Sequence, residues 1–409
     1  LWQQGRPMIE RVSNNAVTQG LVNNIPYVYS FGGIDSTKIW SGIHLRSFRY
    51  NTQADTWETI PALPDTMGKI AAGASTIKNK IYIMGGYHVF SDGHEISSDK
   101  VHIYNPETNS YLADGSPIPV PIDDHVQAVW RDSLIYVVSG WSNNGNVANV
   151  QIYNPSTDTW SAGTPVPNTV NHKVFGASGV IVGDTLYYIG GARYANNFPP
   201  SQYLRKGYID PTDPTNITWT AQAEPNSKGY RMGAAEMLGK AYWLGGSDKT
   251  YNFNGIAYQN SINVLPLDRI VTYSPLTGNL TAATAVAPPV MDLRGVAKTD
   301  STTLIIAGGM MGNQEVTNAV FILYSFPTST DKHFKINDLL IYPNPAKDYF
   351  QVKGLNTGQV KIFNTLGQLM LEKSFSDNEE INIERLPSGM YEVLIFNKNK
   401  KYKSRILIN

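Results

Sequence analysis

Residues 81–111 read IYIMGGYHVFSDGHEISSDKVHIYNPETNSY, and this stretch decides the fold. It opens with a short run of β-branched and aromatic residues that ends in the glycine pair Gly85-Gly86. After a polar loop, a second alternating run at residues 101–104 leads into a turn that begins Asn105-Pro106. Alternation with a period of two indicates half-buried strands, and Asn-Pro marks a tight turn between them.

The same arrangement returns along most of the chain. The glycine pairs are Gly32-Gly33, Gly85-Gly86, Gly190-Gly191, Gly245-Gly246 and Gly308-Gly309, and Ser139-Gly140 fills the one gap. A tyrosine follows each pair, and in three units a tryptophan comes after it, at Trp57, Trp160 and Trp219. The spacing predicts six repeats of roughly 50 residues, each built of four antiparallel strands. One such sheet cannot bury its own apolar faces, but six sheets packed radially can.

The beginning of the chain predicts how this ring closes. Residues 1–8, LWQQGRPM, resemble the fourth-strand segments at residues 57–64 and 160–167. The sixth unit, in contrast, stops near Tyr324 without a tryptophan strand of its own. We therefore expect Trp2 to supply the missing outer strand of the sixth sheet, beside residues 320–324.

At these residues the chain resembles the kelch-repeat six-bladed β-propellers. The resemblance implies an all-β fold, with a six-bladed kelch β-propeller over residues 1–326 and its amino-terminal strand closing blade six. Residues 327–338 are polar and without periodicity, as a linker is. Residues 339–409 read as a small Ig-like β-sandwich with short strands and regular turns.

The small domain carries three motifs that resemble the C-terminal sorting domain of the type IX secretion system of Bacteroidota. They are IYPNPA at residues 341–346, VKIFNTLGQ at 360–368 and LPSGMY at 386–391. The residues that carry the likeness are Tyr342, Pro343, Asn344, Pro345, Gly367, Gly389 and Tyr391.

This resemblance implies recognition by the type IX secretion machinery and export through the periplasm to the outer-membrane surface or the extracellular space. It also implies, as is common in the family, removal of the tail with attachment to surface lipopolysaccharide. The alternative is an ordinary Ig-like accessory domain.

Composition excludes several classes of function. Lys plus Arg and Asp plus Glu both number 33, so the formal net charge is zero and nucleic acid is a poor partner. With no cysteine, the chain has no disulfide, thiolate metal site or cysteine nucleophile. No apolar run is long enough to span a bilayer. No signal peptide is visible, and we read the chain as already processed.

Antiparallel order places the loops after the glycine pairs on the same face as the loops that lead into each innermost strand. We call this the mouth face, because it surrounds one end of the central channel. Arg231 and Arg294 stand at the same offset before their glycine pairs. The candidate ring of channel-mouth cations consists of Arg231, Arg294, Lys173, His125, Lys69 and Arg11. Such a ring suits an anionic ligand such as a carboxylate, although Asp123, Asp124 and Asp292 temper its field. Alternatively, the arginines pair with neighbouring blades and backbone carbonyls.

The loops after the glycine pairs also carry aromatic residues. These are Trp141, Tyr194, Phe198, Tyr203, Tyr251, Phe253 and Tyr258. Aromatic faces beside Asn and Gln suit sugars or extended peptides, because rings offer apolar faces and amides offer directional hydrogen bonds. The alternative is that these long loops simply pack on themselves.

No catalytic constellation stands out, and we expect no cofactor. The GxSxG, P-loop and HExxH patterns do not occur. One loop holds five residues that could ligate a metal, His88, Asp92, His94, Glu95 and Asp99. Their spacing matches no strong metal motif, and a solvated loop is the simpler interpretation.

The favoured hypothesis is a secreted or cell-surface propeller that binds a glycan, peptide or envelope component without chemistry. The alternatives are a sugar isomerase similar to the sialic-acid mutarotases, using Arg231 or Arg294, or a structural or motility-associated surface protein.

Overall fold

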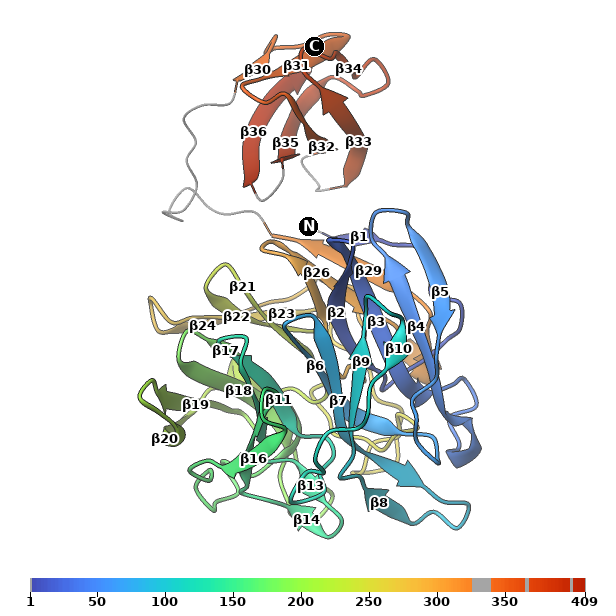
Figure 1. Ribbon diagram of the computed structural model, residues 1–409, viewed down its shortest axis with the longest axis vertical. Helices are drawn as coiled ribbons and strands as arrows, with labels where there is room; N and C mark the ends of the chain where they lie inside the picture. Colours follow the sequence, from blue (N-terminus) through green and yellow to red (C-terminus); the bar gives the residue numbers. More distant parts are fainter. Residues whose placement is uncertain (1, 326–339, 365–367, 398–399, 409) are drawn as a thin grey trace. The chain divides into compact units, whose positions relative to one another are not determined.

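The computed structural model describes residues 2–325, 340–364, 368–397 and 400–408. In these residues the secondary structure consists of strands and three short 3-10 helices, Trp40–Gly42, Pro225–Ser227 and Gly312–Gln314. No helix in these ranges has the length and apolar character that crossing a membrane requires. The chain forms two compact units, one of Gln4–Ile322 and one that holds the carboxyl-terminal strands (Figure 1). The predicted linker, residues 327–338, lies outside the described residues, and the predicted domain limits remain predictions.

The described residues form six propeller sheets, each with a path of four strands; in five of them the strands follow one another in the chain, and in the sixth β1 supplies the outer strand. Blade one contains β2 (Ala16–Val22), β3 (Ile25–Ile34), β4 (Ile43–Asn51) and β5 (Thr56–Ile60). Blade two contains β6 (Ile70–Ile77), β7 (Lys80–Val89), β9 (Val101–Asn105) and β10 (Ser110–Tyr111), and β8 (Glu95–Ser97) pairs with β7. Blade three contains β11 (Val126–Trp130), β12 (Leu134–Val138), β15 (Val150–Asn154) and β16 (Thr159–Ala162).

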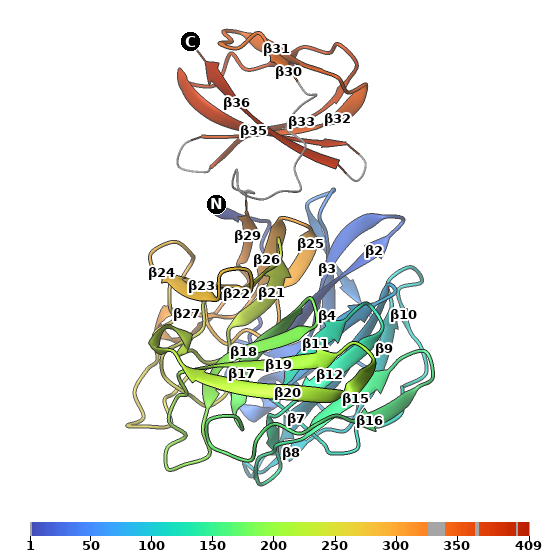
Figure 2. The same ribbon diagram turned by 90° about the vertical axis from the view of Figure 1, so that its left-hand side faces the viewer.

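The other three blades repeat this order, and the sheet of blade four can be followed in Figure 2. Blade four contains β17 (Phe175–Val182), β18 (Thr185–Ala192), β19 (Tyr203–Asp210) and β20 (Asp213–Ala223). Blade five contains β21 (Gly233–Met237), β22 (Lys240–Leu244), β23 (Ile270–Ser274) and β24 (Asn279–Ala283). Blade six contains β25 (Ala297–Asp300), β26 (Thr303–Ala307), β29 (Val320–Tyr324) and β1 (Trp2–Gln4). Two small hairpins lie on loops, β13–β14 (Trp141–Ser142 and Gly145–Asn146) and β27–β28 (Met310–Met311 and Glu315–Val316).

The six innermost strands close into a ring. In sequence order β2, β6, β11, β17, β21 and β25 each contact the next, and β25 contacts β2. Apolar clusters fill the space between successive sheets; one of them joins Tyr136 and Val150 of blade three to Ala177 and Leu186 of blade four. The expected six-bladed β-propeller is therefore confirmed.

The closing strand also lies where the sequence places it. In blade six the outer strand β1 pairs with β29, so the first residues of the chain complete the last sheet. The backbone continues the contact, because Gly5 N donates to Val320 O at 2.8 Å and Met8 N to Asn318 O at 2.8 Å. The prediction that Trp2 belongs to this strand is confirmed.

The recurring tryptophans tie each blade to the connection that precedes it. The indole nitrogen of Trp57 donates to Arg6 O at 2.9 Å. Trp160 does the same to Ser116 O at 2.8 Å, and Trp219 to Thr164 O at 2.9 Å. A repeated aromatic side chain thus supplies both apolar area and one directional bond per junction.

The smaller unit is a β-sandwich. One sheet has the order β30 (Leu340–Tyr342), β31 (Tyr349–Lys353) and β34 (Ile381–Asn382). The other has the order β33 (Leu369–Ser376), β32 (Thr357–Phe363), β35 (Gly389–Asn397) and β36 (Lys400–Ile408). Apolar side chains from both sheets, including Phe350 and Val393, form one core.

The glycine pairs are required by a left-handed backbone conformation and by close contacts that leave no space for a Cβ atom. Gly190 has φ +66°, and a Cβ there would overlap the carbonyl oxygen of Gly229 in the next blade. Gly183 has φ +61° but nothing within 4 Å of a Cβ. Comparing the two positions separates the cost of the left-handed backbone from the cost of the inter-blade overlap.

We therefore expect Gly183→Ala to lower the free energy of unfolding by about 1–2 kcal/mol. Gly190→Ala should lower it by about 3–4 kcal/mol, because the neighbouring blade must also move. Urea denaturation of the two variants measures the difference. Equal losses would mean that the close approach of the blades contributes nothing.

Candidate functional site

The mouth face is bounded by six residues with left-handed backbone, one at the entry to each innermost strand. They are Asn14, Ala71, Asp124, Gly176, Arg231 and Asp292. Their backbones hydrogen-bond from blade to blade. The bonds are Asn14 N to Asp292 O, Asp124 N to Ala71 O, Gly176 N to Asp124 O, Arg231 N to Gly176 O and Leu293 N to Arg231 O, at 2.8–3.1 Å. Ala71 N completes the circle by donating to Asn14 Oδ1 at 2.9 Å. The rim of the channel is therefore a continuous hydrogen-bonded ring.

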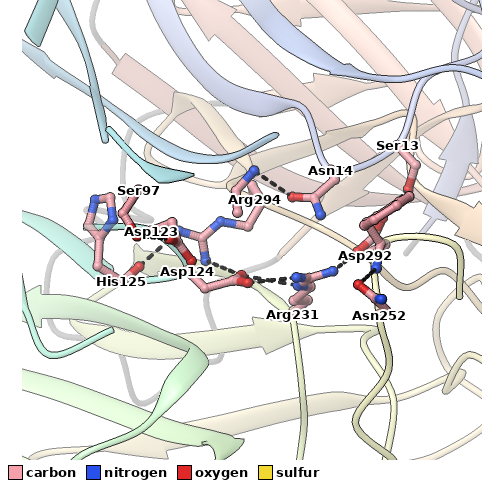
Figure 3. Close-up of polar contacts among 12 residues, drawn as sticks. Ser13, Asn14, Ser97, Asp123, Asp124, His125, Arg231, Asn252, Asp292 and Arg294 are labelled. Carbon is pink, nitrogen blue, oxygen red and sulfur yellow. Dashed lines mark hydrogen bonds and ion pairs between the residues drawn. The ribbon is translucent and has the colours of Figure 1, made fainter. Parts of the chain in front are cut away.

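Arg231 reaches across this ring and is fully engaged (Figure 3). Its Nε and Nη2 donate to the two carboxylate oxygens of Asp124 at 3.0 and 2.6 Å, and its Nη1 donates to Asp292 at 3.0 Å. Arg231 is 1% exposed, and Asp124 and Asp292 are equally buried. Burial lowers the pKa of Arg231, but the adjacent carboxylates outweigh this and raise it well above its ordinary value.

Arg294 is also occupied by protein groups. Its Nη2 donates to His125 O, across the channel in blade three, at 2.9 Å. The sequence offset suggests that Arg231 and Arg294 are equivalent, but the structure places Asp292 at the position of Arg231. Bridges at Tyr230–Ser247 and Met291–Met310 mark the same point in the two blades, and blade six has two more residues between them.

The other four predicted cations do not complete a ring. Lys69 is buried against Asp65, with 2.6 Å between Nζ and Oδ2. Arg11 is exposed and pairs with Glu315. Lys173 lines a separate groove of about 690 Å³ between blades three and four. His125 is buried, and burial together with Arg294 lowers its pKa to about 3, so its side chain is neutral. The contacts of Arg231 and Arg294 match the alternative stated above, in which the arginines pair with neighbouring blades and backbone carbonyls.

The remaining carboxyl group at the ring is also accounted for. Asp123 is buried and accepts a hydrogen bond from Ser97 Oγ at 2.5 Å (Figure 3). Burial, with the neighbouring charge of Asp124, raises its pKa well above the ordinary value, which favours the neutral acid. The two buried arginines thus both lie against buried carboxyl groups, since Arg231 bonds to Asp124 and Asp292 and Arg294 Nη1 lies 3.8 Å from Asp124 Oδ1.

Beneath the ring, the central channel is narrow. Its cavity measures about 90 Å³ and is lined largely by small residues such as Gly73, Gly179 and Gly295. Small-molecule sites in proteins usually occupy about 300–1,000 Å³. The channel has room for a few water molecules and not for a sugar or peptide.

The blade-five insertion covers the mouth. Thr250 Oγ1 donates to Phe198 O in blade four at 2.7 Å. Phe253 packs against a cluster that includes Ile34 of blade one and Tyr87 of blade two. Gly255 lies against Met310 and Gln314 of blade six. The insertion thus contacts blades one, two, four and six.

Most of the predicted loop aromatics gather at the edge of the mouth face, beside blades three and four. Phe198 stacks edge-on against Trp141 and Tyr258, with ring centroids 5.7 and 4.9 Å apart. Tyr194 meets Trp141 at 5.7 Å. Tyr251 is completely buried beside Tyr230, at 4.9 Å. The other two predicted aromatics lie elsewhere, because Tyr203 belongs to strand β19 and Phe253 packs toward blades one and two.

A shallow hollow of about 500 Å³ opens on this aromatic cluster. It is lined by Tyr194, Ala195, Asn196, Asn197, Phe198 and Tyr258. Tyr194 is 57% exposed, and both asparagines are exposed as well. The loop is held by its own backbone, since Arg193 N donates to Pro199 O at 3.0 Å and Phe198 N to Ala195 O at 2.9 Å. The aromatic and amide groups are therefore presented by a preorganised loop.

Sequence reasoning missed two members of this cluster, Phe175 and Tyr230. Phe175 contacts Trp141, Phe198 and Tyr230 at 5.4–5.8 Å. Both residues stand at the entry to an innermost strand, where an aromatic residue reads as ordinary core. Asn196 and Asn197 follow Tyr194 in the sequence, but nothing in the sequence distinguishes them from ordinary polar loop residues.

The sorting-domain residues lie at the edge of the carboxyl-terminal sandwich. Asn344 Oδ1 accepts a hydrogen bond from Leu407 N at 3.0 Å, so the segment with Pro343 and Pro345 is fastened to the last strand. The Tyr391 hydroxyl donates to Pro387 O at 2.7 Å. Tyr342 is exposed, and Gly389 begins β35 with φ +155°. Gly367 lies outside the described residues.

Two of the predicted metal-ligand candidates in the blade-two loop, His94 and His88, lie within hydrogen-bond distance of nearby protein groups. His94 Nδ1 lies 2.6 Å from Asp92 Oδ1, and His88 Nδ1 lies 2.9 Å from Gly68 O. In the part of the chain that the structure describes, no group of three or more His, Asp or Glu side chains is arranged to hold a metal ion.

Comparison with known proteins agrees with this geometry. The family model "KLHDC2/KLHL20/DRC7 Kelch-repeats domain" matches residues 16–246, and "Secretion system C-terminal sorting domain" matches residues 340–409. The Kelch-like protein terF of Aspergillus terreus is 23% identical over 284 residues, which are 65% of this chain and 55% of that protein. Kelch-like protein 35 of Mus musculus is 28% identical over 167 residues, 41% of this chain and 25% of that protein. The match therefore spans little more than half of the fungal relative and a quarter of the mouse one.

A solved structure, titled "Structure of YjhT", shares the fold. The TM-score is 0.61 at 17% sequence identity, and the match covers 86% of this chain and 99% of that one. At this identity the likeness concerns the fold alone.

The buried pairing at the mouth predicts a large stability effect. Arg231→Met leaves Asp292 buried without its cation and Asp124 with only the longer contact to Arg294 at 3.8 Å, and we expect the free energy of unfolding to fall by about 3–5 kcal/mol. The matched control Arg11→Met, at an exposed pair, should change it by about 1 kcal/mol or less. Urea unfolding at pH 7 measures both. A loss no greater than that of the control would show that the ion pairs of Arg231 with Asp124 and Asp292 contribute little to stability.

His125 predicts a pH dependence. Its folded pKa of about 3 lies below the ordinary value, so the unfolded chain binds the extra proton and stability falls as the pH drops below about 6.5. Between pH 7 and pH 5 this group alone should cost about 2 kcal/mol. His125→Gln should flatten the stability profile by that amount, and an unchanged profile would contradict this assignment. Urea midpoints measured across this range test the difference.

Proposed function

Since the chain belongs to the kelch-repeat family, we propose that it is a non-catalytic binding module that holds an extracellular glycan, peptide or envelope component at the edge of its mouth face. The observation that carries the proposal is the hollow beside Tyr194. It combines an exposed aromatic ring with exposed amides on a loop that is already ordered by its own hydrogen bonds. Preorganisation of this kind reduces the entropy lost on binding.

The sorting domain supports a role for this binding outside the cell. Residues 340–409 match a secretion sorting domain, so the protein is a substrate of the type IX secretion machinery and is exported to the cell surface or the extracellular space. A module displayed there meets polysaccharides, peptides and envelope components. Export and the hollow therefore support the same role.

The sugar-isomerase alternative needs a cation that is free to hold an anionic substrate. Arg231 is already bound to Asp124 and Asp292, and Arg294 donates to a backbone carbonyl. Releasing either arginine would leave buried groups unpaired, which is costly. The paired arginines thus support a binding role over an isomerase role.

Screening the full chain against glycan and peptide arrays tests the proposal. We expect at least one ligand whose binding is lost or strongly weakened in Tyr194→Ala. Tyr208→Ala is the matched control, because Tyr208 is 50% exposed in the same blade but lies outside the hollow, and this variant should bind normally. Equal binding by both variants, or no ligand of either class, would refute a recognition role for this hollow.

A further inference from the structure

The hollow beside Tyr194 differs from the rest of the mouth face in having no charge. Its lining residues are two tyrosines, a phenylalanine, an alanine and two asparagines. Burial raises the pKa of Tyr258 well above its ordinary value, so this ring stays neutral. The hollow therefore offers hydrogen bonds and apolar faces but no ionic attraction.

The neighbouring cations do not line the hollow. Arg231 is paired with Asp124 and Asp292 in the ring, and Lys69 is paired with Asp65. Arg193 precedes Tyr194 in the loop but is not among the residues that line the hollow. Lys173 lies in the separate groove between blades three and four. A carboxylate, sulfate or phosphate placed against Tyr194 would lose water without meeting a cation among the lining residues.

The backbone of the loop also disfavours a peptide. A peptide that binds by strand addition needs free main-chain N–H and C=O groups. Here the N–H groups of Arg193, Ala195 and Phe198 are used within the loop, and Thr250 donates to the carbonyl of Phe198. Pro199 and Pro200 have no N–H at all. The polar groups that remain for a ligand include the side-chain amides of Asn196 and Asn197.

An exposed ring with planar amides beside it matches the chemistry of a sugar. One face of a pyranose is a patch of C–H groups that can lie on an aromatic ring, and its hydroxyls both donate and accept hydrogen bonds. An asparagine amide likewise donates through Nδ2 and accepts through Oδ1. Tyr194 is held for this contact by Trp141, whose ring centroid lies 5.7 Å away at 62°.

We propose that the ligand of this hollow is a neutral glycan, with one sugar ring lying on Tyr194 and its hydroxyls bonded to Asn196 and Asn197. This inference rests on the proposed function and narrows it to uncharged saccharides. The volume of about 500 Å³ lies in the range of small-ligand sites, so a short stretch of a longer polysaccharide fits. Recognition then depends on the shape and hydroxyl pattern of the sugar and not on charge.

Calorimetric titration of the full chain with defined ligands tests this directly. The ligands are uncharged hexose and N-acetylhexosamine oligomers, uronic-acid oligomers of the same length, and the peptides found on the arrays. We expect binding of an uncharged oligomer with an affinity that changes less than about twofold between 50 and 500 mM NaCl, because no ion pair is involved.

Three variants locate the site. Tyr194→Ala should weaken binding of the neutral oligomer about threefold to tenfold, the loss expected for one aromatic contact. Asn197→Asp keeps a residue that tolerates the left-handed backbone (φ +58°) but removes the Nδ2 donor, and it should weaken binding in the same direction. Tyr208→Ala should bind like the wild type.

The outcomes separate the two levels of the proposal. Binding of uronic-acid oligomers alone, with affinity that collapses in 500 mM NaCl, would overturn the neutral-glycan inference and leave a binding role in place. Binding of peptides alone, weakened in Tyr194→Ala, would also overturn the neutral-glycan inference and leave a binding role in place. Absence of binding to every class, with the variants folded like the wild type by thermal unfolding, would overturn both.

Discussion

One buried guanidinium determines what the mouth of this propeller can do. Arg231 of blade five binds Asp124 of blade three and Asp292 of blade six, and these residues also belong to the backbone ring that runs around the channel. Burying these groups is costly, and the geometry compensates because three of the five N–H donors of the guanidinium bond to carboxylate oxygens. These bonds occupy Arg231, which favours the proposed recognition at the edge of the mouth face over recognition at the axis.

The fold could be predicted because its constraints act within each repeat. Each glycine pair occupies a place where the backbone is left-handed and a side chain would strike the next blade, as at Gly85 and Gly245. Only glycine meets both conditions easily, so the repeated glycine pairs can be recognised in the sequence. The closing strand was visible for a similar reason, since Trp2 repeats the tryptophan of the fourth strands.

The site was predictable only in part, because side-chain partners depend on long-range geometry. Asp124 lies 107 residues before Arg231, and two extra residues in blade six shift Arg294 away from the equivalent position. The positions of the loop aromatic residues were easier to predict. Tyr194, Phe198 and Tyr258 sit on loops whose face follows from strand order alone. Phe175 was missed because its surroundings, and not its sequence neighbours, make it part of the cluster.

The way the ring closes also sets the order in which the protein can fold. Strand β1 precedes the other propeller strands in the chain, yet its partner β29 follows the other strands of blade six, and Asn318 Nδ2 donates across 310 residues to Met8 O. Pairings of such high contact order form slowly. Until then β29 is an unpaired sheet edge, open to association with other chains. Before this pairing forms, the ring is open and its sixth blade has three of its four strands, and we expect closure to follow once β1 reaches β29.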